Sequence, residues 1–128
     1  MIATASSPDE LMVKLYQDVD RMDAKAYVSH FAADGELTFA NAETVVGRDA
    51  IEEAIAGFFA SIGGISHELS GVWAVDDVIF CQALVTYVRK DGTSLTLPAA
   101  SLGRIKSNLI SEFRIYVDLG PFFSGETV

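Results

Sequence analysis

The chain has 128 residues, 50% hydrophobic and 21% charged, a composition typical of one globular domain with its own core and not of a disordered chain. Its net charge of −9 disfavours nucleic acid as a partner, because affinity for a polyanion depends on basic side chains that displace counterions. No apolar run reaches the ~18 residues of a membrane span, no signal peptide is expected, and a single cysteine, Cys81, predicts a cytoplasmic protein without a disulfide.

The first third of the chain predicts two helices. The first begins at Ser7-Pro8-Asp9-Glu10, where a serine cap precedes proline and a glutamate follows three residues after the cap. Apolar residues then recur at three- and four-residue spacing along one helical face. A second, short helix starts at Asp23, buries Tyr27 and Phe31, and ends at the Ala33-Asp34-Gly35 break.

The middle of the chain predicts a strand pair and a third helix. Residues 36–39 and 43–46 are expected to be short strands around a turn at Asn41. The third helix opens at Gly47, with acidic residues near its positive amino end, and stops at Gly63-Gly64.

From residue 65 the hydrophobic period changes to two, which predicts four long antiparallel strands over residues 67–75, 78–90, 93–106 and 109–119. Three helices followed by such a meander predict an α+β fold, with the helices on one face of a curved sheet. The strand at 78–90 is apolar on both faces, and the helices can cover only one of them. We therefore expect a homodimer that covers the outer face.

Three short motifs carry a family resemblance. They are F-A-x-D at Phe31–Asp34, V-G-R-D-A-I at Val46–Ile51 and R-I-Y-V-D-L at Arg114–Leu119. Over Pro8–Phe123 the chain resembles the nuclear transport factor 2-like superfamily, which includes ketosteroid isomerase, SnoaL-like polyketide cyclases and limonene-epoxide hydrolase. The resemblance implies a single SnoaL-like domain over residues 1–128, with a cone-shaped cavity enclosed by helices and sheet.

The catalytic sets of two of these enzymes are not intact. Phe39 stands where the isomerase-like pattern has its catalytic aspartate, and the stretch 98–101 lacks that pattern's second acid. Ala83 and Val85 replace the arginine and aspartate of the hydrolase-like pattern, so we expect no limonene-epoxide hydrolysis. Of the hydrolase set only the final aspartate survives, as Asp118, which is also a possible counterpart of the acid–base aspartate of SnoaL-like cyclases.

The strand that ends at Asp118 decides between two interpretations. Alternation places Glu112, Arg114, Tyr116 and Asp118 on one face, which either is solvated or lines the cavity. Inside an apolar cone, desolvation raises the pKa of a carboxyl toward the range of a general acid or base. In the alternative, Asp118 pairs with Arg114 or caps the turn before Gly120 and has a structural role.

The remaining candidates are aromatic or basic. Two of them join Asp118 as catalytic candidates, namely Tyr116 and His67, and five are candidates for ligand binding, namely Tyr16, Phe39, Trp73, Tyr87 and Arg114. Each also has an ordinary role open to it in core packing, sheet packing or ion pairing. Parity places His67 and Trp73 on one face of their strand. Two isolated histidines do not form a metal site, and no cofactor motif occurs, so neither a metal nor a cofactor is expected.

Two classes of function remain open, with a third behind them. The first is a cofactor-independent acid–base enzyme, isomerase- or cyclase-like, that acts on a small hydrophobic molecule through Asp118. The second is a non-catalytic module that binds an apolar ligand in the same cavity. The third is a structural dimer whose cavity is filled by its own large side chains. Cavity volume discriminates among them, because pockets for drug-sized ligands start at ~300 Å³.

Overall fold

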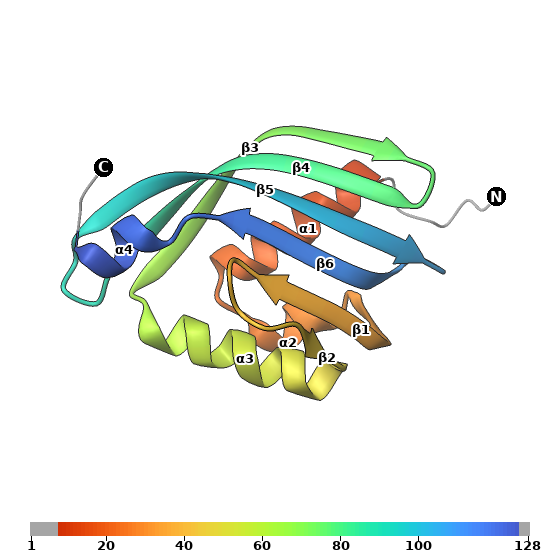
Figure 1. Ribbon diagram of the computed structural model, residues 1–128, viewed down its shortest axis with the longest axis horizontal. Coiled ribbons are helices and arrows are strands. Elements are labelled where there is room, and N and C mark those ends of the chain that lie inside the picture. Colours follow the sequence, from red (N-terminus) through yellow and green to blue (C-terminus); the bar gives the residue numbers. More distant parts are fainter. Residues whose placement is uncertain (1–7, 126–128) are drawn as a thin grey trace.

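The computed structural model describes residues 8–125 as one mixed sheet with helices packed against it (Figure 1). The helices are α1 Pro8–Asp20, α2 Ala24–Val28, α3 Arg48–Ser61 and α4 Gly120–Ser124. The strands are β1 Phe31–Phe39, β2 Val45–Val46, β3 Gly64–Val75, β4 Val78–Val88, β5 Ser94–Lys106 and β6 Leu109–Val117. None of the helices within residues 8–125 is long and apolar enough to cross a membrane.

The six strands lie in the order β2-β1-β6-β5-β4-β3. The meander β3 to β6 is antiparallel, as its period-two pattern predicts. The prediction of a purely antiparallel sheet is wrong, because β1 pairs with β6 in parallel. A parallel pair needs a long crossover between its strands, and here the whole segment from β2 to β5 provides it.

The start of the chain differs from its prediction in where the second helix ends. Asp23 caps α2 as predicted, since its carboxylate accepts a hydrogen bond of 3.0 Å from the backbone N–H of Ala26. The helix ends at Val28, however, and Phe31 already lies in β1, opposite Ile110 of β6. Pairing with a distant strand thus overrides the local helical pattern. The predicted serine cap of the first helix, Ser7, lies outside the described residues.

Residues 8–125 contain four helices where three were predicted, the additional one being α4. It has proline at its first turn, as helix starts favour, but it is only five residues long. Arg89, the residue after β4, holds it in place by donating to the carbonyls of Phe122 (3.2 Å) and Pro121 (3.3 Å). The Arg89 guanidinium also lies 5.3 Å from the centre of the Phe122 ring, a cation–π contact.

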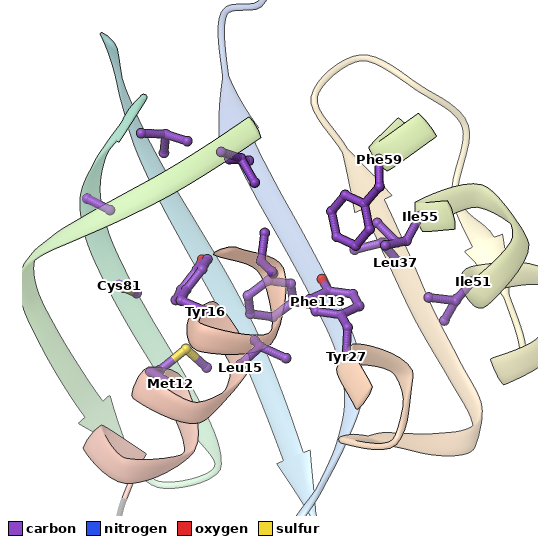
Figure 2. Packing of buried hydrophobic residues seen from close by; sticks show 14 of the residues in the cluster. Met12, Leu15, Tyr16, Tyr27, Leu37, Ile51, Ile55, Phe59, Cys81 and Phe113 are labelled. Atoms are coloured by element: carbon purple, nitrogen blue, oxygen red, sulfur yellow. The ribbon is translucent and has the colours of Figure 1, made fainter. Parts of the chain in front are cut away.

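The core fills the space between the helices and the inner face of the sheet. Figure 2 shows Tyr16, Tyr27 and Phe113 gathered at its centre, with Met12 and Leu15 of α1 beside them. All five side chains are buried. Burying an apolar side chain of this size contributes ~1.5–3 kcal/mol to the stability of the fold. The elements that supply these side chains, α1, α2 and β6, therefore stabilise one another by packing. This arrangement fixes which residues face the interior at the site described next.

Candidate functional site

A small cavity lies between the inner face of the sheet and helices α1, α2 and α3. Its volume is about 40 Å³, room for about three water molecules at ~10–15 Å³ each. Six phenylalanine and tyrosine side chains are among the residues that line it: Tyr16, Tyr27, Phe39, Phe58, Phe59 and Tyr87. Among the described residues that line it there is no carboxylate, lysine or arginine. The cavity is therefore apolar, and its few polar groups stand out.

His67 supplies the most reactive of these groups, and Asp20 fixes its orientation. The ring Nδ1 lies 2.7 Å from Asp20 Oδ1, and the backbone N–H of His67 donates to Asp20 Oδ2 over 3.2 Å. Because a carboxylate only accepts, Nδ1 carries the proton and Nε2 is left as the acceptor. The His67 side chain is 8% exposed and that of Asp20 is 32% exposed. A carboxylate at the end of α1 thus selects one tautomer of a histidine on β3.

Two effects on the pKa of His67 oppose each other. Burial lowers it, while the hydrogen bond and the charge of Asp20 raise it. Burial is the larger effect, so the pKa of His67 lies below its usual value of 6.5. At neutral pH the ring is uncharged and can accept a proton, which is the state that a general base requires.

The ring of Tyr16 packs against the ring of His67. Its ring centre lies 4.5 Å from that of His67, and its hydroxyl is 2.7 Å from Ser101 Oγ on β5. Burial raises the pKa of Tyr16 above its ordinary value, so the phenol keeps its proton. The hydroxyls of Tyr16 and Ser101 thus each have one hydrogen-bond partner inside the core.

Tyr27 has no such partner. Its side chain is 1% exposed, it lines the cavity, and its hydroxyl makes no hydrogen bond to any described residue. Burial also raises the pKa of Tyr27 well above the ordinary value. An unsatisfied buried hydroxyl is rare in native proteins, and where one occurs it has an explanation such as a catalytic role or a bound water or ion.

The structure places four of the predicted site residues at the cavity: Tyr16, Phe39, His67 and Tyr87. Phe39 packs edge-on against Phe58 at 5.1 Å between ring centres. Burial raises the pKa of Tyr87 to about 12. Their contact with a substrate or ligand stays a prediction.

The expected position of Asp118 inside the cone is wrong. Its side chain is exposed, and Oδ1 accepts a hydrogen bond of 2.9 Å from the backbone N–H of Gly120, the turn-capping alternative. Tyr116 is 57% exposed, and Arg114 pairs at 2.6 Å with Glu112. Alternation along β6 is as predicted, but Phe113 and Ile115 take the inner face. The polar set of this strand therefore lies on the outer face of the sheet, away from the helices.

The predicted shared face of His67 and Trp73 is also wrong. The β3–β4 register shifts between Leu69 and Gly71, which marks a β-bulge. One extra residue reverses the alternation, so Trp73 pairs with Phe80 on the outer face and is 55% exposed. A single sequence gives no clear signal for this bulge.

Asp20, Tyr27 and Ser101 were missed as site residues. Asp20 follows Tyr16 by four positions on α1, so helical spacing already places the two on one face. Its pairing with His67 joins residues 47 positions apart, and no local pattern encodes it. Tyr27 carries the signature of a core residue only, because the sequence cannot reveal that its hydroxyl is unpartnered.

A second, open depression of about 400 Å³ lies over β3, β4 and β5. Its lining residues are Ser66, His67, Glu68, Leu84, Thr86 and Thr96. The hydroxyl oxygens of Thr86 and Thr96 lie 2.8 Å apart. Within residues 8–125 no cluster of three histidine, cysteine or acidic side chains has the arrangement of a metal site.

Three solved structures share this fold. A protein with a ketosteroid isomerase-like fold from Catenulispora acidiphila, in complex with trimethylamine, is 23% identical over 88% of each chain, with a TM-score of 0.82. A protein from Jannaschia sp. CCS1, for which a SnoaL-like polyketide cyclase activity is proposed, is 15% identical over 97% of this chain and 94% of that one, with a TM-score of 0.83. An epoxide hydrolase of the limonene-epoxide hydrolase type from M. tuberculosis is 9% identical over 95% and 90%, with a TM-score of 0.78.

The fold is thus that of the nuclear transport factor 2-like proteins, as the resemblance implied. The family model of the SnoaL-like domain matches residues 12–113, from α1 into β6. The chain belongs to this SnoaL-like family.

Proposed function

We propose that the protein is an acid–base enzyme in which His67 removes a proton from a small, uncharged molecule. The observation that carries the proposal is that Asp20 accepts hydrogen bonds from both the ring and the backbone of His67, which leaves the ring Nε2 to accept a proton. Once protonated, the imidazolium is stabilised by the Asp20 carboxylate beside it, as in other histidine–aspartate pairs. The wall of aromatic rings supports an apolar substrate.

The volume of the cavity limits the size of that substrate. At about 40 Å³ it lies far below the ~300 Å³ of pockets for drug-sized ligands, and a cone wide enough for a steroid or polyketide is not confirmed. We propose a substrate of at most about six non-hydrogen atoms, because three waters take up ~90 Å³ at ~30 Å³ each in the liquid, a volume that only such a small molecule can share. The trimethylamine bound to the relative from Catenulispora acidiphila is a molecule of this size class.

Exchange of carbon-bound hydrogen tests the proposal directly. Cyclopentanone in D2O serves as the probe, and NMR follows the loss of its α-protons in the presence of wild-type protein, His67→Asn and Asp118→Asn. Asparagine at 67 retains a donor toward Asp20 but no basic nitrogen. We expect His67→Asn to slow exchange ~100- to 10,000-fold. Asp118→Asn serves as the control and leaves the rate unchanged, because the residue lies outside the cavity.

Equal rates for wild type and His67→Asn would contradict the proposal. Exchange no faster than in buffer would favour the alternative, a non-catalytic module that binds a small apolar ligand. One observation supports that alternative. The hydrogen bonds and the stacking on Tyr16 account fully for a structural role of His67.

We further propose a homodimer through the outer face of the sheet. Large apolar side chains that are exposed in the single chain share this face: Trp73, Phe80, Leu84 and Tyr116. Cross-strand pairing joins Trp73 to Phe80 and places Leu102 beside them. The helices cover only the opposite face, so a second copy is the occupant that we propose for this patch.

A further inference from the structure

The hydroxyl of Tyr27 is the one buried side-chain polar group within residues 8–125 that has no hydrogen-bond partner. Moving a phenol from water to an apolar site without a hydrogen-bond partner costs free energy, so buried hydroxyls are rarely left unpaired. Tyr27 sits on α2 with its side chain 1% exposed, and it forms part of the cavity wall. A molecule in the cavity would therefore lie beside this unpartnered hydroxyl.

The chemistry of the cavity wall defines that partner. Burial keeps the Tyr27 phenol protonated, so the hydroxyl offers a proton to an acceptor. The Tyr16 and Ser101 hydroxyls share one hydrogen bond, whereas the Tyr27 hydroxyl has no partner at all among the described residues. No carboxylate, lysine or arginine among the described residues faces the cavity, so neither a cation nor an anion finds a counter-charge there.

We propose that Tyr27 is a ligand-binding residue, whose hydroxyl donates a hydrogen bond to the carbonyl oxygen of a small neutral ketone or aldehyde. The apolar part of the molecule then lies among the aromatic rings, which bury it without demanding further hydrogen bonds. This inference rests on the proposed function for the identity of the site and names the class of substrate for it. A donor on the carbonyl oxygen also acidifies the adjacent C–H bonds, the position from which His67 accepts a proton.

Binding of two matched probes tests the inference without requiring turnover. Cyclopentanone and methylenecyclopentane have the same shape, but only the ketone has an acceptor oxygen. Chemical-shift titrations with each probe are performed on the wild type, on Tyr27→Phe, and on Tyr116→Phe as the control that loses an exposed hydroxyl outside the cavity. We expect the wild type to prefer the ketone, and Tyr27→Phe to lose about tenfold in ketone affinity with unchanged alkene affinity.

A second measurement does not depend on any variant. The carbonyl 13C resonance of labelled cyclopentanone moves downfield when its oxygen accepts a hydrogen bond, so binding to the wild type should produce this shift. Equal affinity of the wild type for both probes, binding of neither probe, or Tyr27→Phe titrating like the wild type would each overturn the inference. The Tyr27 hydroxyl would then be satisfied by water alone.

The two proposals fail separately. His67→Asn should slow exchange of the α-protons of cyclopentanone far more than it weakens binding of the ketone. If His67→Asn leaves exchange unchanged but Tyr27→Phe still weakens ketone binding, the catalytic proposal fails and the binding role of Tyr27 stands. The reverse pattern retains the base and removes Tyr27 from the site.

Discussion

Burial and a neighbouring carboxylate act on the ring of His67 in opposite directions. Burial dominates, so the pKa of His67 in the folded protein lies below the 6.5 of an exposed histidine. Asp20 limits the decrease and sets the tautomer. The same two contacts thus prepare a base for neutral pH and make the fold sensitive to acid.

The pH dependence of stability follows with a definite sign. Because the folded pKa of His67 is depressed, the unfolded chain binds this proton first as the pH falls below about 6.5. The stability that neutral His67 contributes is complete above that pH and is lost as the pH falls toward the folded pKa. We expect urea unfolding of the wild type to show a larger loss between pH 7.5 and 5.5 than unfolding of His67→Asn, which has no such titration.

Asp20→Asn provides the control for the cause of the shift. It removes the charge that holds the pKa of His67 up, so the pKa falls further and the acid-sensitive window widens. NMR titration of the His67 ring measures both. If wild type and His67→Asn lose stability in parallel over this range, the acid sensitivity arises from other groups and His67 is not its source.

At the scale of elements, local patterns predicted most of the fold and long-range pairing decided the rest. The period change at residue 65, the cap at Asp23 and the glycines around α3 each report on their own neighbourhood, and the corresponding elements are present. The parallel pairing of β1 with β6 joins distant segments. Because of it, β1 begins at Phe31, five residues before the predicted start at residue 36. No local signal announces such a pairing.

The candidate site shows the same division more sharply. Alternation correctly sorted the side chains of β6 into two sets, but it does not say which set faces the helices. Asp118 was chosen because its face is polar, and the polar face proved to be the outer one. The bulge between Leu69 and Gly71 then separated His67 from Trp73. The pairing of His67 with Asp20 required the packing of α1 on β3, which a single sequence does not reveal.

Helix α4 depends on the side chain of the residue that follows β4. Arg89 donates to two carbonyls of the helix and lies against the ring of Phe122, which in turn packs on Tyr87 at 5.7 Å between ring centres. We expect Arg89→Ala to destabilise the protein by ~1–2 kcal/mol in urea unfolding, because two hydrogen bonds to α4, another to Thr93 and a cation–π contact are lost. Hydrogen exchange at Phe123, whose amide bonds to the carbonyl of Leu119, should accelerate.

Arg89→Lys separates charge from geometry in the same experiment. Lysine retains the positive charge but lacks the planar fork that reaches both carbonyls. We expect it to recover only part of the lost stability. Full protection of α4 in Arg89→Ala would show that the contact between Phe122 and Tyr87 alone holds the helix.

On the scale of the whole molecule, the sheet has one face packed and one face open. Alternation along β4 buries Ile79, Ala83 and Val85 beneath the helices and leaves Phe80 and Leu84 more than 40% exposed on the other side. A large exposed apolar face lowers the solubility of an isolated chain. The net charge of −9, carried by other parts of the surface, then has to keep the protein in solution.

We therefore expect the wild type to sediment as a dimer at micromolar concentration and Phe80→Glu to sediment as a monomer. A buried glutamate on each side of a two-fold interface is desolvated and lies near its own copy, and both effects oppose association. Val13→Glu is the matched control, because Val13 is equally exposed but lies on α1, away from the outer face. A stable dimer is expected to bury ~1,200–2,000 Å² in total, more than the four side chains alone provide, so the whole β3–β6 surface takes part. A monomeric wild type would contradict the dimer, and a Phe80→Glu variant that dimerises as Val13→Glu does would place the contact outside this face.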